Sequence, residues 1–281
     1  MNALLFATTV FVWGTTWIAI AMQLGPVPVL TSIFYRFALA ALLLLPVLAL
    51  LGRLAPTRPR DHLFMALQGL CLFSLNFVCF YNATRFIPSG LVSVVFSLAT
   101  IYNAVNARLF APAVREGILG PDAPLGLALA ALGTLFFSFG NMVSRRNSAA
   151  GVPPLTANAY GMTYASLALL AVLAATGTPL VAPPDTRYLL ALGWLAVFGS
   201  VIGFTTYLML VARIGSGRAA YATVMFPVIA LLLSALYEGY VFDLRTAIGL
   251  GLTILGNLVI FGGLRWPGAR ASAAPPLPGR S

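Results

Sequence analysis

Residues 76–108 read NFVCFYNATRFIPSGLVSVVFSLATIYNAVNAR, and this stretch decides the fold. It consists of two apolar segments joined by the short turn Pro88-Ser89-Gly90. A related pattern returns over residues 203–238, where apolar segments flank Gly215-Ser216-Gly217. Both copies carry aromatic, hydroxyl or amide side chains within apolar surroundings, and a polar atom placed there costs a few kcal/mol unless it finds a partner or water. We therefore predict two helical hairpins that line a polar cavity.

The composition places the chain in a membrane. Sixty per cent of the residues are hydrophobic and only 8% are charged, which leaves too little charge to cover a soluble surface. Several uncharged runs are long enough to cross about 30 Å of hydrocarbon as a helix. Because backbone groups must be satisfied internally in lipid and no strand alternation occurs, we predict an all-α, polytopic membrane protein.

The net charge of +10 does not indicate nucleic-acid binding, because the basic residues are all arginines scattered between apolar runs. Cys71 and Cys79 lie two turns apart in one apolar segment, too far to form a disulfide within a helix. We expect buried free thiols, no metal site and no cofactor. The single histidine, His62, adjoins Asp61 and is expected in a loop.

Nine apolar segments can be marked. They are residues 3–22, 29–51, a third that ends at Thr84, 88–108, 125–144, 155–176, 188–211, 218–237 and 246–264. The first is expected to be a membrane span, because no basic region precedes it and no small-residue cleavage site follows it as in a signal peptide.

The distribution of arginine favours ten spans. Nine spans would divide the loop arginines almost evenly between the two sides, whereas cytoplasmic loops normally carry the excess. One more crossing between Phe110 and Ala123 leaves only Arg85, Arg187 and Arg245 outside. The other loop arginines then lie inside: Arg53, Arg58, Arg60, Arg108, Arg115, Arg145, Arg146, Arg213, Arg218, Arg265, Arg270 and Arg280. We expect a truncated fifth span there; a short re-entrant helix is the alternative.

Ten spans divide into two five-helix repeats of opposite orientation. The expected repeats are residues 1–123, with an incomplete fifth span, and 124–264, followed by a disordered cytoplasmic tail over 265–281. Both termini are then cytoplasmic. Inverted repeats of this kind bind their substrate near the membrane midplane and work by alternating access.

Several motifs resemble the drug/metabolite transporter superfamily, and specifically its EamA-type exporters. They are Trp13-Gly14-Thr15-Thr16-Trp17, Tyr35-Arg36-Phe37, the two Ser-Gly hairpins, Pro227 and Glu238. Residues 140–146 (GNMVSRR) and 156–162 (TANAYGM) further resemble the YddG-type aromatic amino-acid exporters. The chain departs from the pattern at Ala111, where the family has an acidic residue, and in its short fifth span.

The resemblance implies a transporter that exports small amphipathic metabolites, above all aromatic or neutral amino acids, across a bacterial inner membrane. Export of drugs or of other metabolites by the same fold is one alternative, and a non-transporting scaffold or lipid-handling subunit is another. We expect no enzyme, because no catalytic arrangement of Ser, His or paired Asp occurs within the spans. The expected partners are a small-molecule substrate and the lipid bilayer, with the chain acting as a monomer.

The candidate substrate-binding residues are aromatic and amide side chains within the spans. They are Trp17, Asn76, Phe80, Tyr81, Asn82, Tyr102, Asn103, Tyr160, Tyr164, Tyr207 and Tyr221. The alternative for each is ordinary packing, interhelical hydrogen bonding or anchoring at the membrane interface. The candidate hinges are Pro88, Gly90, Gly215 and Gly217.

Charged residues within the spans are scarce. Arg36 lies about a turn and a half inside the second span, where it either snorkels, pairs with another helix or attracts a substrate carboxylate. Glu238 is expected to be a structural acid or a helix partner. Since no Asp or Glu lies in the middle of any span, we expect uncoupled efflux or exchange rather than proton-driven transport.

Overall fold

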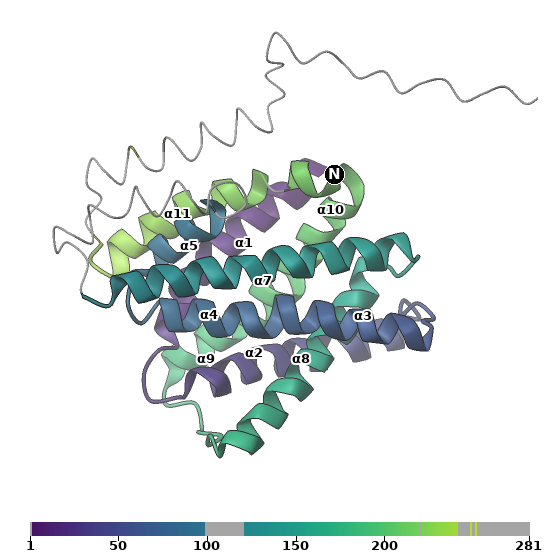
Figure 1. Ribbon diagram of the computed structural model, residues 1–281, viewed down its shortest axis with the longest axis horizontal. Helices are drawn as coiled ribbons and strands as arrows, with labels where there is room; N and C mark the ends of the chain where they lie inside the picture. Colours follow the sequence, from purple (N-terminus) through teal and green to yellow (C-terminus); the bar gives the residue numbers. More distant parts are fainter. Residues whose placement is uncertain (1, 99–120, 220, 241–247, 249–250, 252–281) are drawn as a thin grey trace, which may run out of the picture.

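The computed structural model describes residues 2–98, 121–219, 221–240, 248 and 251. Every regular element there is helical, and Figure 1 shows the long helices running side by side in one bundle. In chain order the elements are α1 (Asn2–Met22), α2 (Val29–Leu50), α3 (Pro59–Leu70), η1 (Cys71–Leu75), α4 (Asn76–Ala83), α5 (Ser89–Leu98), α7 (Ala123–Ala149), α8 (Pro154–Thr176), α9 (Thr186–Gly193), η2 (Trp194–Ile202), α10 (Gly203–Ala219) and α11 (Tyr221–Tyr237).

Six helical stretches are long and apolar enough to cross a membrane, and α11 is a shorter apolar helix. The six stretches are Asn2–Met22, Val29–Leu50, Pro59–Ala83, Ala123–Ala149, Pro154–Thr176 and Thr186–Gly215. They confirm the prediction of an all-α, polytopic membrane protein. The predicted crossing after Phe110 and the segment 246–264 lie outside the described residues, apart from isolated positions, so ten inverted spans stay a proposal.

Two of the spans contain π-helical turns. In the third span η1 joins α3 to α4, and η2 joins α9 to α10 in the span Thr186–Gly215. A π-turn inserts an extra residue into the helix and so re-aims the side chains that follow; such turns occur frequently at functional sites. Asn76 comes directly after η1, and Ser200 lies within η2.

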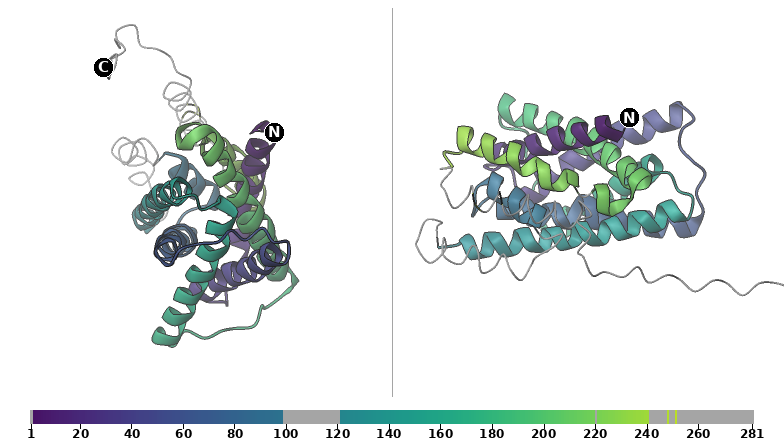
Figure 2. Two further views of the ribbon diagram at one scale, coloured as in Figure 1. Left: turned by 90° about the vertical axis from the view of Figure 1, so that its right-hand side faces the viewer. Right: turned by 90° about the horizontal axis from the view of Figure 1, so that it is seen from above.

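The packing brings distant parts of the sequence together. Helix α2 packs on α8, α3 packs on both α7 and α8, and α4 packs on α7. Helix α1 packs on α10 and α11, and α5 packs on α11. Each half of the sequence therefore contributes helices to one common interior, and Figure 2 shows helices from early and late parts of the chain packed in one bundle.

Glycines allow the closest helix contacts. A Cβ atom at Gly69 of α3 would overlap the backbone carbonyl of Gly161 in α8, and one at Gly90 of α5 would overlap Leu231 and Ser234 of α11. Small residues at such crossings let helix backbones approach in a membrane, where packing rather than hydrophobicity drives association.

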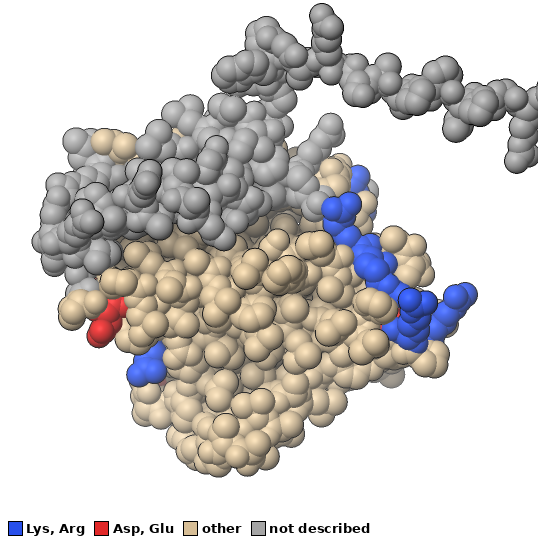
Figure 3. Space-filling model, viewed as in Figure 1, with Lys and Arg blue, Asp and Glu red and all other residues tan. Residues whose placement is uncertain are grey.

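One end of the bundle carries a buried polar network. Asn147 donates to Gln68 Oε1 at 2.9 Å, Gln68 donates to Asn158 at 3.5 Å, and Arg146 pairs with Asp61 at 3.3 Å. These bonds join α3, α7 and α8 near the start of α3, the end of α7 and the start of α8. The arginines gather at this end in Figure 3.

His62 belongs to this end as well, and its expected place in a loop is wrong. It lies in the first turn of α3, because the Asp61 carboxylate accepts the Arg58 backbone N–H and so starts the helix there. Its ring contacts Tyr164 through a 2.6 Å hydrogen bond and Thr57 through one of 2.8 Å.

The contact between α3 and α8 gives a stability prediction. Gly69→Ala should lower the free energy of unfolding by about 1–3 kcal/mol, because the obstructing atom is a backbone oxygen that can move only with its helix. Gly193→Ala is the matched control, since its Cβ would meet no atom within 4 Å. Thermal unfolding in detergent measures both; equal stability of the two variants would contradict the close approach.

Candidate functional site

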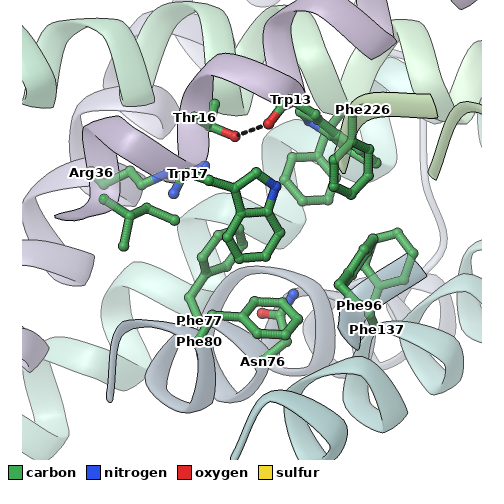
Figure 4. Close-up of a pocket in the computed structure, with 12 residues that line it drawn as sticks. Trp13, Thr16, Trp17, Arg36, Asn76, Phe77, Phe80, Phe96, Phe137 and Phe226 are labelled. Carbon is green, nitrogen blue, oxygen red and sulfur yellow. Dashed lines mark hydrogen bonds between the residues drawn. The ribbon is translucent and has the colours of Figure 1, made fainter. Parts of the chain in front are cut away.

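A small cavity lies between the helices of both halves of the chain (Figure 4). Its volume is about 30 Å³, room for about two water molecules. Its wall is mostly aromatic: the lining residues are Trp13, Thr16, Trp17, Ile20, Arg36, Asn76, Phe77, Phe80, Phe96, Phe137, Phe204 and Phe226.

The aromatic rings form one connected cluster around this cavity. The Trp17 ring stacks on Phe226 with centroids 6.0 Å apart and meets the Phe80 ring edge-on at 5.4 Å. Phe96 and Phe137 approach to 4.6 Å, also edge-on. Edge-to-face and stacked pairs at these distances stabilise the closed arrangement by about 0.5–1.5 kcal/mol each beyond the area they bury.

Arg36 of α2 adds a charge to this apolar wall. Its exposed fraction is 1%, so it does not snorkel to an interface. Its Nε donates to Ser200 Oγ at 2.9 Å. Pairing with another helix was one of the alternatives that the sequence left open for Arg36. Its guanidinium lies 4.2 Å from the ring centroid of Phe77 and 5.1 Å from that of Phe37.

Other polar atoms of the residues that line the cavity have no partners. Both amide atoms of Asn76, the indole Nε1 of Trp17 and the Nη1 of Arg36 are buried and make no hydrogen bond in the structure. By contrast, Trp13 Nε1 donates to the Gly199 carbonyl at 3.3 Å. Unpaired buried donors and acceptors cost about 1–3 kcal/mol each, so this group is suited to bind a ligand with polar ends.

Three of the predicted site residues, Trp17, Asn76 and Phe80, line the cavity. The sequence prediction did not include most of the other lining residues, among them Phe137, Phe204 and Phe226. A phenylalanine in an apolar span carries no polar signal that distinguishes a cavity wall from ordinary packing. Pro227 within α11 marked the neighbourhood of Phe226 without indicating which face it presents.

Other predicted residues lie near the cavity wall or further away. Tyr81 is buried and donates to Gln23 Oε1 at 2.7 Å. Tyr207 is buried behind the wall, with its ring 4.8 Å from Trp13, and accepts a bond of 3.4 Å from Asn141. Asn82 bonds the Val78 carbonyl of its own helix, and Tyr221 is partly buried at the start of α11.

Tyr160 and Tyr164 form a separate cluster away from the cavity lining. Their rings stack at 6.3 Å on one face of α8, as their spacing predicted. The ring of His62 meets that of Tyr160 edge-on at 4.8 Å. This cluster joins α8 to α3 at the arginine-rich end of the bundle.

The remaining predicted positions are partly described. Tyr102 and Asn103 lie outside the described residues. Pro88 and Gly90 lie at the start of α5, and Gly215 interrupts α10 with a φ of 82° and a ψ of 157°. Gly217 follows within the same helix. A φ in this range favours glycine, so the chain bends at Gly215 without the strain another residue would meet.

Glu238 connects the two helices that carry Phe96 and Phe226. Its carboxylate accepts the Ser89 hydroxyl at 2.5 Å and the Ser89 backbone N–H at 3.2 Å, which confirms its expected role as a helix partner. The first N–H groups of a helix lack intrahelical acceptors, and a carboxylate there is also favoured by the helix dipole. A side chain that follows α11 thus caps α5.

This cap gives a second prediction. Glu238→Ala should destabilise the protein by about 1–2 kcal/mol, because the first turn of α5 loses its acceptor. Glu238→Gln keeps an acceptor oxygen and should lose less. Thermal unfolding in detergent measures the order, and a wild-type midpoint for Glu238→Ala would contradict the cap.

Comparison with known proteins places this fold among transporters. The chain is 28% identical over 270 residues to the inner membrane transporter YedA of Escherichia coli K12, covering 89% of this chain and 87% of YedA. It is 23% identical over 289 residues to PagO of Salmonella typhimurium, covering 91% and 93% of the two chains. A transporter of Archaeoglobus fulgidus is 24% identical over 282 residues, covering 92% and 97%.

The fold is also similar to that of a protein of known crystal structure. The two superpose with a TM-score of 0.63 over 94% of this chain and 98% of the other, at 20% sequence identity. At that identity the likeness concerns the fold alone.

The sequence model of one family covers most of the chain. It is that of the EamA-like transporters, and it matches residues 1–112 and 124–262. This family is one of transporters and not of enzymes. Because that model covers most of the chain and the described part contains six apolar helical spans, the chain belongs to the EamA-like transporter family and is a polytopic membrane transporter.

Proposed function

We propose that this transporter exports small amphipathic metabolites, chiefly aromatic and neutral amino acids, from the cytoplasm by alternating access. The observation that carries the proposal is the small cavity whose aromatic wall includes residues with unpartnered polar atoms. Apolar rings suit an aromatic or large aliphatic side chain, and convergent polar groups suit the charged end of the same molecule.

The size of the cavity supports alternating access. A volume of about 30 Å³ holds water but no amino acid, whereas ligand sites usually enclose about 300–1,000 Å³. Binding therefore requires the helices around the cavity to separate. The two segments matched by the family, 1–112 and 124–262, support two repeats that move against each other, with residues 265–281 as a tail.

The arginine distribution supports the orientation. Arg53, Arg58 and Arg60 are exposed at the end of the bundle where α2 ends and α3 begins, and Arg146 joins them from the end of α7. In the positive-inside pattern this end is cytoplasmic, and so are both termini if ten spans are present. The printed name of YedA as an inner membrane transporter supports the bacterial inner membrane as the location.

The position of the described acids supports transport without ion coupling. Asp61, Asp122, Asp185 and Glu238 all lie at or beyond helix ends in the described part of the chain. Proton-driven carriers normally place an ionisable group within the membrane to relay the proton. We therefore propose facilitated efflux or exchange by a monomer, driven by the gradient of the solute.

Counterflow into proteoliposomes tests both parts of this proposal. Vesicles loaded with unlabelled L-phenylalanine should accumulate labelled L-phenylalanine equally with and without an imposed pH gradient. Concentrative uptake that depends on the pH gradient would contradict uncoupled transport, and absence of exchange for phenylalanine, tryptophan and leucine would contradict the substrate class.

The aromatic wall predicts a mutational effect on the same assay. Phe137→Ala should reduce phenylalanine exchange about tenfold, because a lost ring contact is worth about 1–1.5 kcal/mol. Phe139→Ala is the matched control: it lies two residues away on α7 and is 49% exposed on the outer side. Equal exchange by the two variants would place the substrate elsewhere.

A further inference from the structure

We infer that Arg36 is the anchor for a carboxylate of the transported solute. The inference rests on the proposed function in taking the cavity as the transport site. It goes further by naming the group that every substrate must carry, and it excludes organic cations that lack an acid group.

The first step is the burial of a charge that no described carboxylate neutralises. Arg36 lines the cavity and is 1% exposed. None of the described carboxylates forms an ion pair with Arg36; Asp61 pairs with Arg146 instead. A charge inside the membrane normally pairs with another group or marks a binding pathway, because an unpaired ion there is costly.

The second step is the way the guanidinium is held. Ser200 Oγ accepts from Arg36 Nε and donates to the Leu195 carbonyl at 2.9 Å, five residues earlier in η2. The rings of Phe37 and Phe77 hold the planar group from α2 and α4. A Cβ at residue 199 would lie 3.2 Å from Arg36 Nη2, so Gly199 leaves room for the fork. The arginine is therefore fixed before any ligand binds.

The third step is the set of groups left free around it. Nη1 of Arg36 and Nε1 of Trp17 are buried donors without partners, and both residues line the same cavity (Figure 4). Arginine recognises carboxylates well because its rigid fork matches two oxygens. The unpartnered Oδ1 of Asn76, on the same cavity, is an acceptor for the ammonium group of an amino acid.

The test is a binding titration that separates the acid group from the ring. Tryptophan fluorescence of the detergent-purified full chain reports ligands, since Trp13 and Trp17 line the cavity. The probes are 3-phenylpropionate against 2-phenylethylamine, and 4-methylpentanoate against isoamylamine. We expect each acid to bind about tenfold or more tightly than its matched amine. Sodium chloride is titrated separately as an inorganic anion.

Variants assign the effect to Arg36. In Arg36→Met the preference for the acids should disappear; a buried ion replaced by an apolar side chain of similar size often leaves folding intact. Arg36→Lys keeps the charge without the fork and should retain a reduced preference. Arg146→Lys, at the end of the bundle away from the cavity lining, is the control and should bind as the wild type does.

The outcomes separate this inference from the proposed function. Equal binding of acids and amines by the wild type overturns the inference. Chloride binding without carboxylate binding overturns it as well. Neither result contradicts aromatic transport, which the counterflow assay tests separately. In a further outcome, the wild type binds both acids more tightly than their amines and yet binds 3-phenylpropionate no more tightly than 4-methylpentanoate. That result supports Arg36 as the anchor and contradicts the aromatic substrate class. If Arg36→Met does not fold, the wild-type titration and Arg36→Lys decide.

Discussion

The structure depends on one constraint: inside an apolar bundle, each polar atom must find its partner within the protein. Some buried polar side chains, such as Thr134 and Ser166, bond a carbonyl of their own helix, and others bond a different segment of the chain. Asn147 and Gln68 join α7 to α3, Tyr81 bonds Gln23, and Arg36 bonds Ser200. The exceptions include four atoms of Arg36, Trp17 and Asn76, all on the one cavity. A polar group left unpaired there is available to bind a ligand.

The helices pack closely in some places and are held apart in others, at the level of the cavity. Where Gly69 meets Gly161, two backbones touch and no space remains. At the level of the cavity, large rings hold the helices apart, and Trp13 occupies the space that Gly203 leaves on α10, while Thr16 and Arg36 lie beside Gly199 of η2. Large rings beside glycines can repack with little change of backbone, which suits a site that must open and close. The two π-turns place Asn76 and Ser200 at this level.

Much of the helical arrangement could be predicted from the sequence, whereas the site could be predicted only in part. The apolar runs gave the spans to within a few residues, because hydrocarbon thickness fixes their length. Helical spacing also put Tyr160 and Tyr164 on one face, where their rings do stack. The spacing did not predict that this face contacts His62 and lies away from the cavity. The sequence of one helix does not indicate which neighbouring helix each of its faces will contact.

The sequence by itself therefore determined the class of protein, the positions of its spans and the end of the bundle that carries the arginines. These properties depend on composition and on the local periodicity of one helix at a time. Only the tertiary structure decided which polar groups are satisfied and which remain free. Arg36 illustrates the reason: its partner Ser200 is 164 residues away, on a helix whose π-turn sets the direction of that hydroxyl. Which side chains bond across two helices depends on how the helices pack, and the spacing of residues within either helix does not determine that packing.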